Sequence, residues 1–254
     1  MKDHQNKLQG LRVLNTRPWE QGQNLSAAIA HAGGLSIDVP AIAIEPTTDD
    51  WISALPKLAL VDQVIFISAN AVNYFYKALE QSQLPWSNTI QTTTIGHASA
   101  KALEHWGIAA CHIPLIADSE HLLQLDVFQE VKHQTILLIK GEGGRMNIAH
   151  TLINRGANLV SLTVYRRCLP QNAAHDLRAV WHDDRVDVIL FTSQEAIQNL
   201  FLLLGVDAHA WLRQMPCLVI SHRLAEVAAQ FGMQKVIVSR YDAILDALEH
   251  YKKG

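Results

Sequence analysis

Short apolar runs along the chain alternate with longer segments whose apolar residues recur at helical spacing. Residues 11–14 form the first run, and the next segment places Leu25 and Ile29 on one face of a helix. Thr16 is expected to cap this helix, with Pro18 at its first helical position. Strands alternating with helices of this length indicate right-handed βαβ units and parallel sheets covered on both faces.

One architectural unit occurs twice in the sequence. Residues 11–45 contain a strand, a polar turn, an amphipathic helix, a glycine stop and a second strand, and residues 136–167 repeat that order. Farther along, Ser68 corresponds to Ser193, 125 residues later. A period of this length is too long for a solenoid repeat, so we predict a duplicated domain.

The apolar runs predict ten strands in two equivalent sets. After residues 11–14 and an extended stretch ending near residue 44, the expected strands are residues 63–67, 92–95, 109–113, 136–139, 159–165, 187–191, 217–220 and 235–238. Helices separate them, including one that starts at Asp118 and continues through Val131. The predicted fold class is α/β, with two similar lobes, each a parallel five-stranded sheet flanked by helices.

Polar or proline-bearing breaks lie near residues 46 and 170, and no low-complexity linker falls near the midpoint of the chain. We therefore place a domain crossing at residues 41–46 rather than in the middle. Two similar lobes that face each other would create a cleft whose walls are equivalent edges of two sheets. Such a cleft is where we expect a ligand to bind.

Composition narrows the classes of function. The 254-residue chain has a formal net charge of −3, which argues against nucleic-acid binding. Residues 135–170 nevertheless carry five basic residues against one acidic residue, which suits an anionic small molecule. Cys111, Cys168 and Cys217 follow no ligand spacing, so neither a disulfide framework nor a metal site is predicted. The polar start of the chain and the lack of an apolar run of about 18 residues predict a cytoplasmic protein without membrane contact.

Four strand-to-helix turns are candidate ligand contacts. They carry Arg17, Ser68, His97 with Ser99, and Ser193. In doubly wound sheets such turns lie at the carboxyl ends of strands, where helix N-termini offer free N–H groups to anions. Ordinary capping with nothing bound is the better explanation of any one of these turns, but four of them in two facing lobes slightly favour ligand binding.

A glycine-rich loop follows the strand at residues 136–139. Its sequence is KGEGGR, and Lys140, Gly141 and Arg145 are candidate anion contacts. The loop matches neither GxGxxG nor the P-loop pattern. Nucleotide binding is therefore a weaker hypothesis than a flexible, backbone-exposing anion contact, and a plain turn is the alternative.

His97 and His222 occupy equivalent positions in the two halves. Either could act as a general acid or a hydrogen-bond donor, or the equivalence reflects turn geometry alone. Tyr165 ends an apolar strand beside two arginines. Its phenol could donate a proton to a leaving oxygen, and the alternative is an aromatic side chain that packs the domain crossing.

Six segments, taken in order, resemble one known family: VLNTRP at 13–18, FISANAV at 66–72, TIGHASA at 94–100, GEGGR at 141–145, VYR at 164–166 and FTS at 191–193. No single segment is diagnostic. Their order and spacing are similar to those of uroporphyrinogen-III synthases, which close and rearrange the linear tetrapyrrole hydroxymethylbilane on the route to haem.

The resemblance implies a particular division of the chain. One lobe comprises residues 1–41 and 170–254, and residues 46–164 form the second, inserted lobe. Residues 41–46 and 164–170 become a two-stranded extended hinge. Catalysis is implied in the cleft between the lobes, without a metal or a cofactor.

The resemblance also assigns residues. The family's cleft tyrosine falls on Tyr165, its hydroxyl residue at the fourth turn on Ser99 and its serine turn on Ser193. The chain departs from the family near its end, where Ser221, His222 and Arg223 stand in place of a threonine turn. Ser221 and His222 are therefore candidate substitutes in substrate binding.

The implied reaction is cyclisation of hydroxymethylbilane to uroporphyrinogen III, with loss of water and inversion of ring D through an azafulvene and a spiro intermediate. Tyr165 would assist departure of the hydroxide. We expect a monomer whose partner is this small-molecule substrate, and a transient contact with the preceding pathway enzyme stays open. A non-catalytic two-lobe binder of anionic metabolites is the first alternative, and a nucleotide-dependent enzyme using residues 140–145 is the second.

Overall fold

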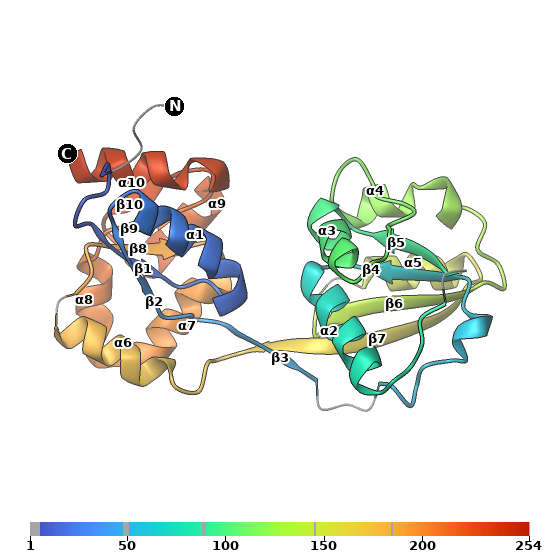
Figure 1. Cartoon of the computed structure of the whole chain (residues 1–254). Helices are drawn as coiled ribbons and strands as arrows, with labels where there is room; N and C mark the ends of the chain where they lie inside the picture. Colours follow the sequence, from blue (N-terminus) through green and yellow to red (C-terminus); the bar gives the residue numbers. More distant parts are fainter. Residues whose placement is uncertain (1–5, 48–50, 88–89, 145, 184, 254) are drawn as a thin grey trace. The chain divides into compact units, whose positions relative to one another are not determined.

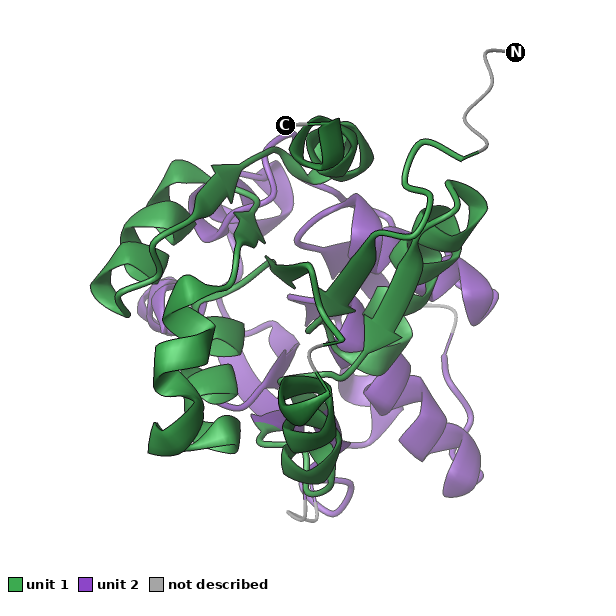
Figure 2. Ribbon diagram, turned by 90° about the vertical axis from the view of Figure 1, so that its left-hand side faces the viewer, with its two compact units in different colours: residues 1–43, 168–254 green, residues 44–167 purple. Residues whose placement is uncertain are grey.

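The computed structural model describes residues 6–47, 51–87, 90–144, 146–183 and 185–253. Within these ranges, no helix is long and apolar enough to cross a membrane. The chain divides into two compact units (Figure 2). Unit 1 comprises Met1–Ala43 and Cys168–Gly254, and unit 2 comprises Ile44–Arg167.

Unit 1 contains a five-stranded sheet with the strand order β10-β9-β8-β1-β2 (Figure 1). The strands are β1 (Arg12–Asn15), β2 (Leu35–Asp38), β8 (Val188–Phe191), β9 (Cys217–Val219) and β10 (Val236–Val238), and all neighbouring pairs are parallel. This sheet matches the prediction of a parallel five-stranded sheet.

Successive apolar residues of the unit 1 strands enter different cores, because side chains alternate across a strand. Leu14 and Ile189 belong to a core with α6 (Ala173–His182), α7 (Gln194–Leu204), α8 (His209–Gln214) and α9 (His222–Gln230). Val13 and Val188 belong to the other core, with α1 (Trp19–His31) and α10 (Ile244–Lys253). The sheet is therefore covered on both faces.

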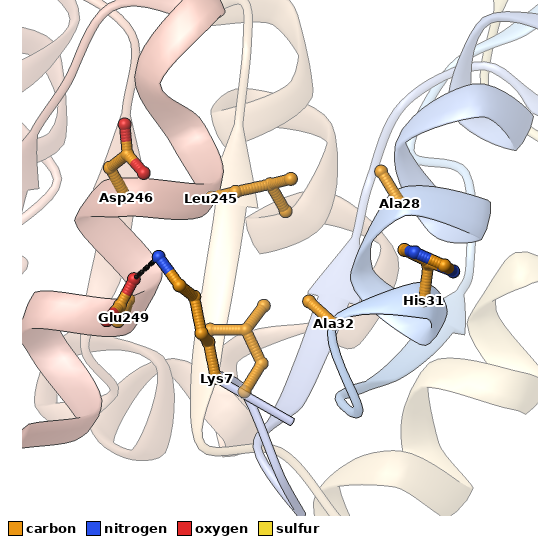
Figure 3. Close-up of a pocket in the computed structure, with 8 residues that line it drawn as sticks. Lys7, Ala28, His31, Ala32, Leu245, Asp246 and Glu249 are labelled. Atoms are coloured by element: carbon orange, nitrogen blue, oxygen red, sulfur yellow. Dashed lines mark ion pairs between the residues drawn. The ribbon is translucent and has the colours of Figure 1, made fainter. Parts of the chain in front are cut away.

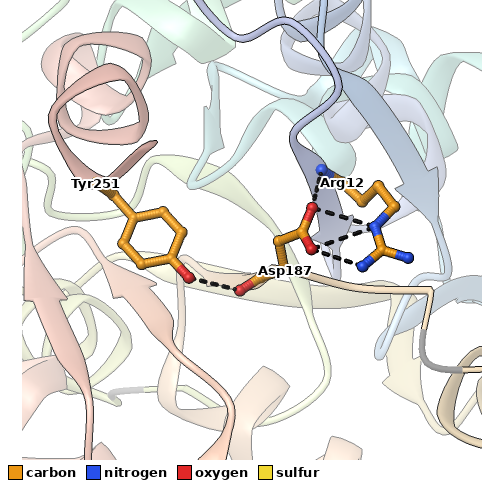
Figure 4. Close-up of polar contacts among 3 residues, drawn as sticks. All are labelled: Arg12, Asp187 and Tyr251. Atoms are coloured by element: carbon orange, nitrogen blue, oxygen red, sulfur yellow. Dashed lines mark hydrogen bonds and ion pairs between the residues drawn. The ribbon is translucent and has the colours of Figure 1, made fainter. Parts of the chain in front are cut away.

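One polar cluster ties the two chain segments of unit 1 together (Figure 4). The Asp187 carboxylate accepts hydrogen bonds from Arg12 through the backbone N–H at 2.7 Å and through Nη2 at 2.6 Å. The Asp187 carbonyl oxygen accepts one from the Tyr251 hydroxyl at 3.0 Å. The start of β1, the approach to β8 and helix α10 thus meet at Asp187.

Unit 2 contains the second five-stranded sheet, with the order β3-β7-β6-β4-β5. β4 (Gln63–Phe66), β5 (Gln91–Thr94), β6 (Thr135–Gly141) and β7 (Asn158–Cys168) pair in parallel. The fifth strand is β3 (Ala43–Pro46), beside β7. Glu45 pairs with Arg166 at 3.3 Å, and the Thr47 N–H donates to the Val164 oxygen at 3.4 Å. The residue number rises from 45 to 47 on one segment while that of its partner falls from 166 to 164, so β3 runs antiparallel to β7.

The predicted strand at residues 109–113 is wrong as an element. Only an isolated bridge between Thr93 and His112 remains there, and β3 supplies the fifth strand at the opposite edge. The physical reason is the sequence AACHI, in which Cys111 is exposed and only one β-branched residue is present. Such a segment has little apolar surface to bury on two faces.

Helices cover both faces of the unit 2 sheet as well. α2 (Ala69–Gln81) and α3 (His97–His105) pack on the face that carries Phe66 and Ile139. α4 (Ser119–Leu123) and α5 (Asn147–Asn154) pack on the face that carries Ile65 and Leu138. The helix predicted from Asp118 to Val131 ends early, because Leu125 has ψ 137° and a short 3-10 turn follows.

Helix caps reflect the internal repeat. Ser68 accepts the Ala71 N–H at 3.0 Å at the start of α2, and Ser193 accepts the Ala196 N–H at 3.1 Å at the start of α7. The predicted cap of α1 is wrong. Pro18 occupies the N-cap without a side-chain bond, and Thr16 Oγ1 instead donates to the Leu190 carbonyl oxygen at 2.7 Å.

Candidate functional site

Three residues predicted from the sequence meet at the carboxyl edge of the unit 2 sheet. Ser68 follows β4, Gly141 ends β6 and Tyr165 lies on β7. The Tyr165 hydroxyl oxygen is 3.1 Å from Ser68 Oγ, within hydrogen-bond distance. The side chain of Tyr165 is buried, with 6% of its surface exposed. The structure thus holds one phenol between a helix cap and a neighbouring strand.

A bulge aims Tyr165 into this position. Lys140 pairs with Thr163, whereas Gly141 pairs with Tyr165, so Val164 is an extra residue on β7. In a regular strand Val164 and Tyr165 would point to opposite faces, but here both belong to the same core. Bulges are known to redirect side chains next to active sites.

Gly141 makes the close approach of Tyr165 possible. A Cβ at Gly141 would lie 2.4 Å from Cζ of the tyrosine and 2.7 and 2.8 Å from the two Cε atoms. The similar distances place that position over the face of the ring. The backbone of Glu142 reinforces the contact, because its N–H donates to the Tyr165 carbonyl oxygen at 2.8 Å. Glycine is required here for space and not for backbone conformation.

The other predicted residues of unit 2 are less closely grouped. His97 is the exposed first residue of α3, after Gly96 at the N-cap. Ser99 is buried in that helix, with 2% of the residue exposed, which is less than Tyr165 at 6%. Lys140 is half-buried at the end of β6. Arg145 lies outside the described residues.

Unit 1 has its own set of predicted site residues, which lie at the carboxyl edge of its sheet. The Arg17 side chain follows β1, hydrogen-bonds the Tyr241 hydroxyl through Nη1 and lies with Cζ 4.9 Å from the centre of that ring. Ser193 caps α7, and Ser221 caps α9 by accepting the Leu224 N–H at 3.3 Å. His222 is the exposed first residue of α9.

His97 and His222 belong to different units, so each is part of a separate turn. Within the described ranges, no three His, Cys, Asp or Glu side chains lie together so that they could hold a metal ion. A role of either histidine as a general acid or hydrogen-bond donor stays a prediction, as does the alternative of turn geometry alone.

Sequence reasoning missed three residues that position the predicted ones. Asn15 is buried at the end of β1, and its Oδ1 accepts the Arg17 N–H at 3.3 Å while its amide donates to Asp38 at 3.1 Å. A polar residue that ends a buried strand was the available signal. Tyr241, beside Arg17, and Tyr74, whose ring lies 5.9 Å from that of Tyr165, gave none, because an isolated aromatic usually indicates packing.

A pocket of about 270 Å³ lies elsewhere in unit 1, between the start of the chain and helices α1 and α10 (Figure 3). Its walls are mostly apolar, with Leu8, Ala32 and Leu245, and the Lys7–Glu249 ion pair at 2.8 Å crosses one side. None of the residues predicted to bind substrate lines it. The pocket is therefore distinct from both sheet-edge sets.

The described geometry can be compared with known proteins. The family model for "Uroporphyrinogen-III synthase HemD" matches residues 23–244. The chain belongs to the uroporphyrinogen-III synthase family. The resemblance stated from its sequence segments is confirmed by this match, which spans most of the chain and includes both sheet-edge sets apart from Arg17.

Family members of known name and structure agree with this assignment. The uroporphyrinogen-III synthase of Salmonella typhimurium is 29% identical over 94% of the chain and 100% of its own length, and that of Escherichia coli gives the same values. The Helicobacter pylori enzyme structure matches with a TM-score of 0.65 at 12% identity, covering 96% of this chain and 99% of that one. A Thermus thermophilus mutant enzyme gives 0.61 at 18% identity, with 96% and 98% covered. These structures support the α/β fold with two five-stranded sheets.

Proposed function

We propose that the protein catalyses the cyclisation of hydroxymethylbilane to uroporphyrinogen III. One observation carries the proposal from family to chemistry: in a member of this family, the phenol of Tyr165 lies 3.1 Å from Ser68 Oγ at a sheet edge lined by helix N-termini. A carboxylate-rich substrate needs many N–H donors and a few cations, and this edge offers both.

In the proposed first step, the C–O bond of the ring A hydroxymethyl group breaks. The Tyr165 hydroxyl gives its proton to the leaving hydroxide, which departs as water, and the pyrrole nitrogen supplies the electron pair that forms the azafulvene. The substituted α-carbon of ring D attacks the azafulvene methylene, which forms the spiro intermediate. The bond from that carbon to the methylene bridge of ring C then breaks to give a second azafulvene, and the free α-carbon of ring D attacks it, so that ring D is inverted. The proton released in the final aromatisation restores the phenol.

The remaining predicted residues would hold the substrate in a curled conformation. Ser68, Ser99, His97, Lys140 and Gly141 act from unit 2, and Arg17, Ser193, Ser221 and His222 act from unit 1. Holding the geometry is itself much of the selectivity, because closure without inversion gives the symmetric isomer. Cationic and N–H donors in place of a strong nucleophile fit that task.

We also propose that residues 41–46 and 164–170 form a hinge. The support is local: β3 lies beside β7, Glu45 pairs with Arg166 and Cys168 Sγ donates to the Ala43 oxygen at 3.9 Å. Both chain crossings between the units fall inside these contacts. Two short segments that connect the units would permit relative motion of the units.

The alternative of a non-catalytic binder is separated from the proposal by turnover. Purified protein is incubated with freshly generated hydroxymethylbilane, the product is oxidised and the uroporphyrin isomers are resolved by chromatography. We expect predominantly type III, formed faster than in a heat-inactivated control. Type I alone, at the rate of that control, would refute the proposal and favour the metabolite binder. Monomeric state and a cytoplasmic location stay predictions.

A further inference from the structure

Helix α2 contacts both the hydroxyl group and the ring of Tyr165. Ser68, the N-cap of α2, lies 3.1 Å from the Tyr165 hydroxyl. Tyr74, in the second turn of the same helix, stacks its ring on that of Tyr165, with centroids 5.9 Å apart and an interplanar angle of 23°. One rigid element therefore contacts the tip and the ring of the same side chain.

Tyr74 is itself fixed at its far end. Its hydroxyl donates to the Ile44 carbonyl oxygen at 2.5 Å, and Ile44 lies on β3, the edge strand beside β7. Its ring is half-buried and packs against the core of unit 2. Tyr74 thus joins α2 and β3 beside the ring of Tyr165, and Ile44 and Tyr165 both belong to unit 2.

We propose that Tyr74 is a positioning residue for the reaction, which holds the Tyr165 ring against Gly141 so that the phenol faces the leaving group. Two contacts restrain the ring plane, the Gly141 backbone at the ring face and the stacked Tyr74 ring. Without Tyr74, the ring loses its stacked partner and keeps the Gly141 backbone at its face and the hydroxyl contact with Ser68, so its orientation is less restrained. The inference rests on the proposed function, because it assigns a role toward the acid that function requires.

Tyr76 provides a matched control on the same helix. It is 5% exposed, belongs to the same core and packs on Phe66 and Trp106. Its hydroxyl oxygen has no hydrogen-bond partner among the described residues. Tyr76→Phe removes a hydroxyl oxygen from the same helix, as Tyr74→Phe does, but leaves the surroundings of Tyr165 unchanged.

The test compares Tyr74→Leu, Tyr74→Phe and Tyr76→Phe in the full-length chain. We expect Tyr74→Leu to lower kcat by about tenfold to a hundredfold with KM nearly unchanged, because orientation and not binding is lost. Tyr74→Phe keeps the ring and should recover most of kcat. Tyr76→Phe should match the unmodified protein. Equal kcat for Tyr74→Leu and the unmodified protein would overturn the proposal.

A second readout does not depend on activity. In protein labelled with ring-¹³C tyrosine, the Tyr165 signal is assigned by its loss in Tyr165→Phe. It should shift in Tyr74→Leu as the stacked ring current is removed, and stay near its original position in Tyr74→Phe and Tyr76→Phe. An unmoved signal in a folded Tyr74→Leu would overturn the proposal. If that variant does not fold, Tyr74→Met replaces it, and an unmoved Tyr165 signal in Tyr74→Met would overturn the proposal in the same way. Full turnover by Tyr165→Phe would instead refute the acid role of Tyr165 while the spectra still decide whether Tyr74 holds its ring.

Discussion

Ser68 Oγ lies 3.1 Å from the hydroxyl oxygen of Tyr165 and also accepts the N–H of Ala71. One serine therefore caps α2 and contacts the proposed acid. This double use connects the stability of the helix start with the orientation of the phenol. Changes at the two residues should consequently have different signatures in stability and in turnover.

Replacing Tyr165 with Phe removes the hydroxyl and leaves the ring in place. We expect kcat to fall by about a hundredfold or more, the usual contribution of a general acid. The free energy of unfolding should fall by only about 1 kcal/mol, because one hydrogen bond to Ser68 is lost. Isomer-resolved product analysis and urea unfolding measure the two effects. Unchanged turnover would remove Tyr165 from the mechanism.

Gly141→Ala tests the seat of the Tyr165 ring. The added methyl would lie 2.4 Å from Cζ of Tyr165, so the ring must move away from β6. We expect about 1 to 3 kcal/mol of destabilisation from overpacking, together with a large loss of turnover. Urea unfolding and the isomer assay check both expectations.

As the control, Gly141→Ala is introduced into a variant that already carries Tyr165→Ala. With the ring gone, the methyl has room, so the cost of Gly141→Ala should shrink to a few tenths of a kcal/mol in this double-mutant cycle. An equal cost in both backgrounds would mean that the methyl strains the backbone of β6 rather than displacing Tyr165.

The strand periodicity was sufficient to predict the central strands and most helices. Leu14 and Val64 lie in apolar runs bounded by turns, and such runs have few alternatives to a buried strand. The predicted strand at residues 109–113 was wrong because its apolar run consists mostly of small residues, which do not favour a strand. The local pattern did not predict β3 as a strand of the unit 2 sheet. The pairing of β3 with β7 is a contact between segments far apart in the sequence, and a local pattern does not encode such a contact.

The helix-cap residues of the candidate site were predictable, because a cap depends on the local sequence at a turn. Ser68 and Ser193 are N-cap residues, and a serine after a buried strand is a strong local signal. The bulge that aims Tyr165 and the stacking of Tyr74 depend on how strands and helices meet. Such tertiary contacts leave no mark at a fixed sequence spacing.

Asp187→Asn tests the polar cluster of unit 1. Hydrogen bonds from the Arg12 side chain hold the pKa of the Asp187 carboxyl below its ordinary value. Because the folded-state pKa is depressed, the stabilisation is complete above the unfolded-state value of about 4. It is lost as the pH falls through the lower folded-state value.

We therefore expect Asp187→Asn to cost about 1 to 2 kcal/mol at pH 7. The difference from the unmodified protein should narrow steadily below about pH 4 in urea unfolding series. Glu226→Gln, which changes an exposed carboxylate on α9, is the control and should show little difference at pH 7. A difference for Asp187→Asn that does not depend on pH would contradict the role of its charge.

Ser221 combines two roles that substitutions can separate. Its Oγ accepts the Leu224 N–H as the cap of α9, and its hydroxyl proton is available to a substrate carboxylate. Ser221→Ala should lower the free energy of unfolding by about 1 kcal/mol and raise KM by up to about tenfold. Ser221→Asp should restore the cap and the stability but raise KM further, because its carboxylate repels the anionic substrate. Thermal unfolding and initial rates at several substrate concentrations distinguish the roles. If both variants kept the original KM while only Ser221→Ala lost stability, Ser221 would be a helix cap and not a substrate contact.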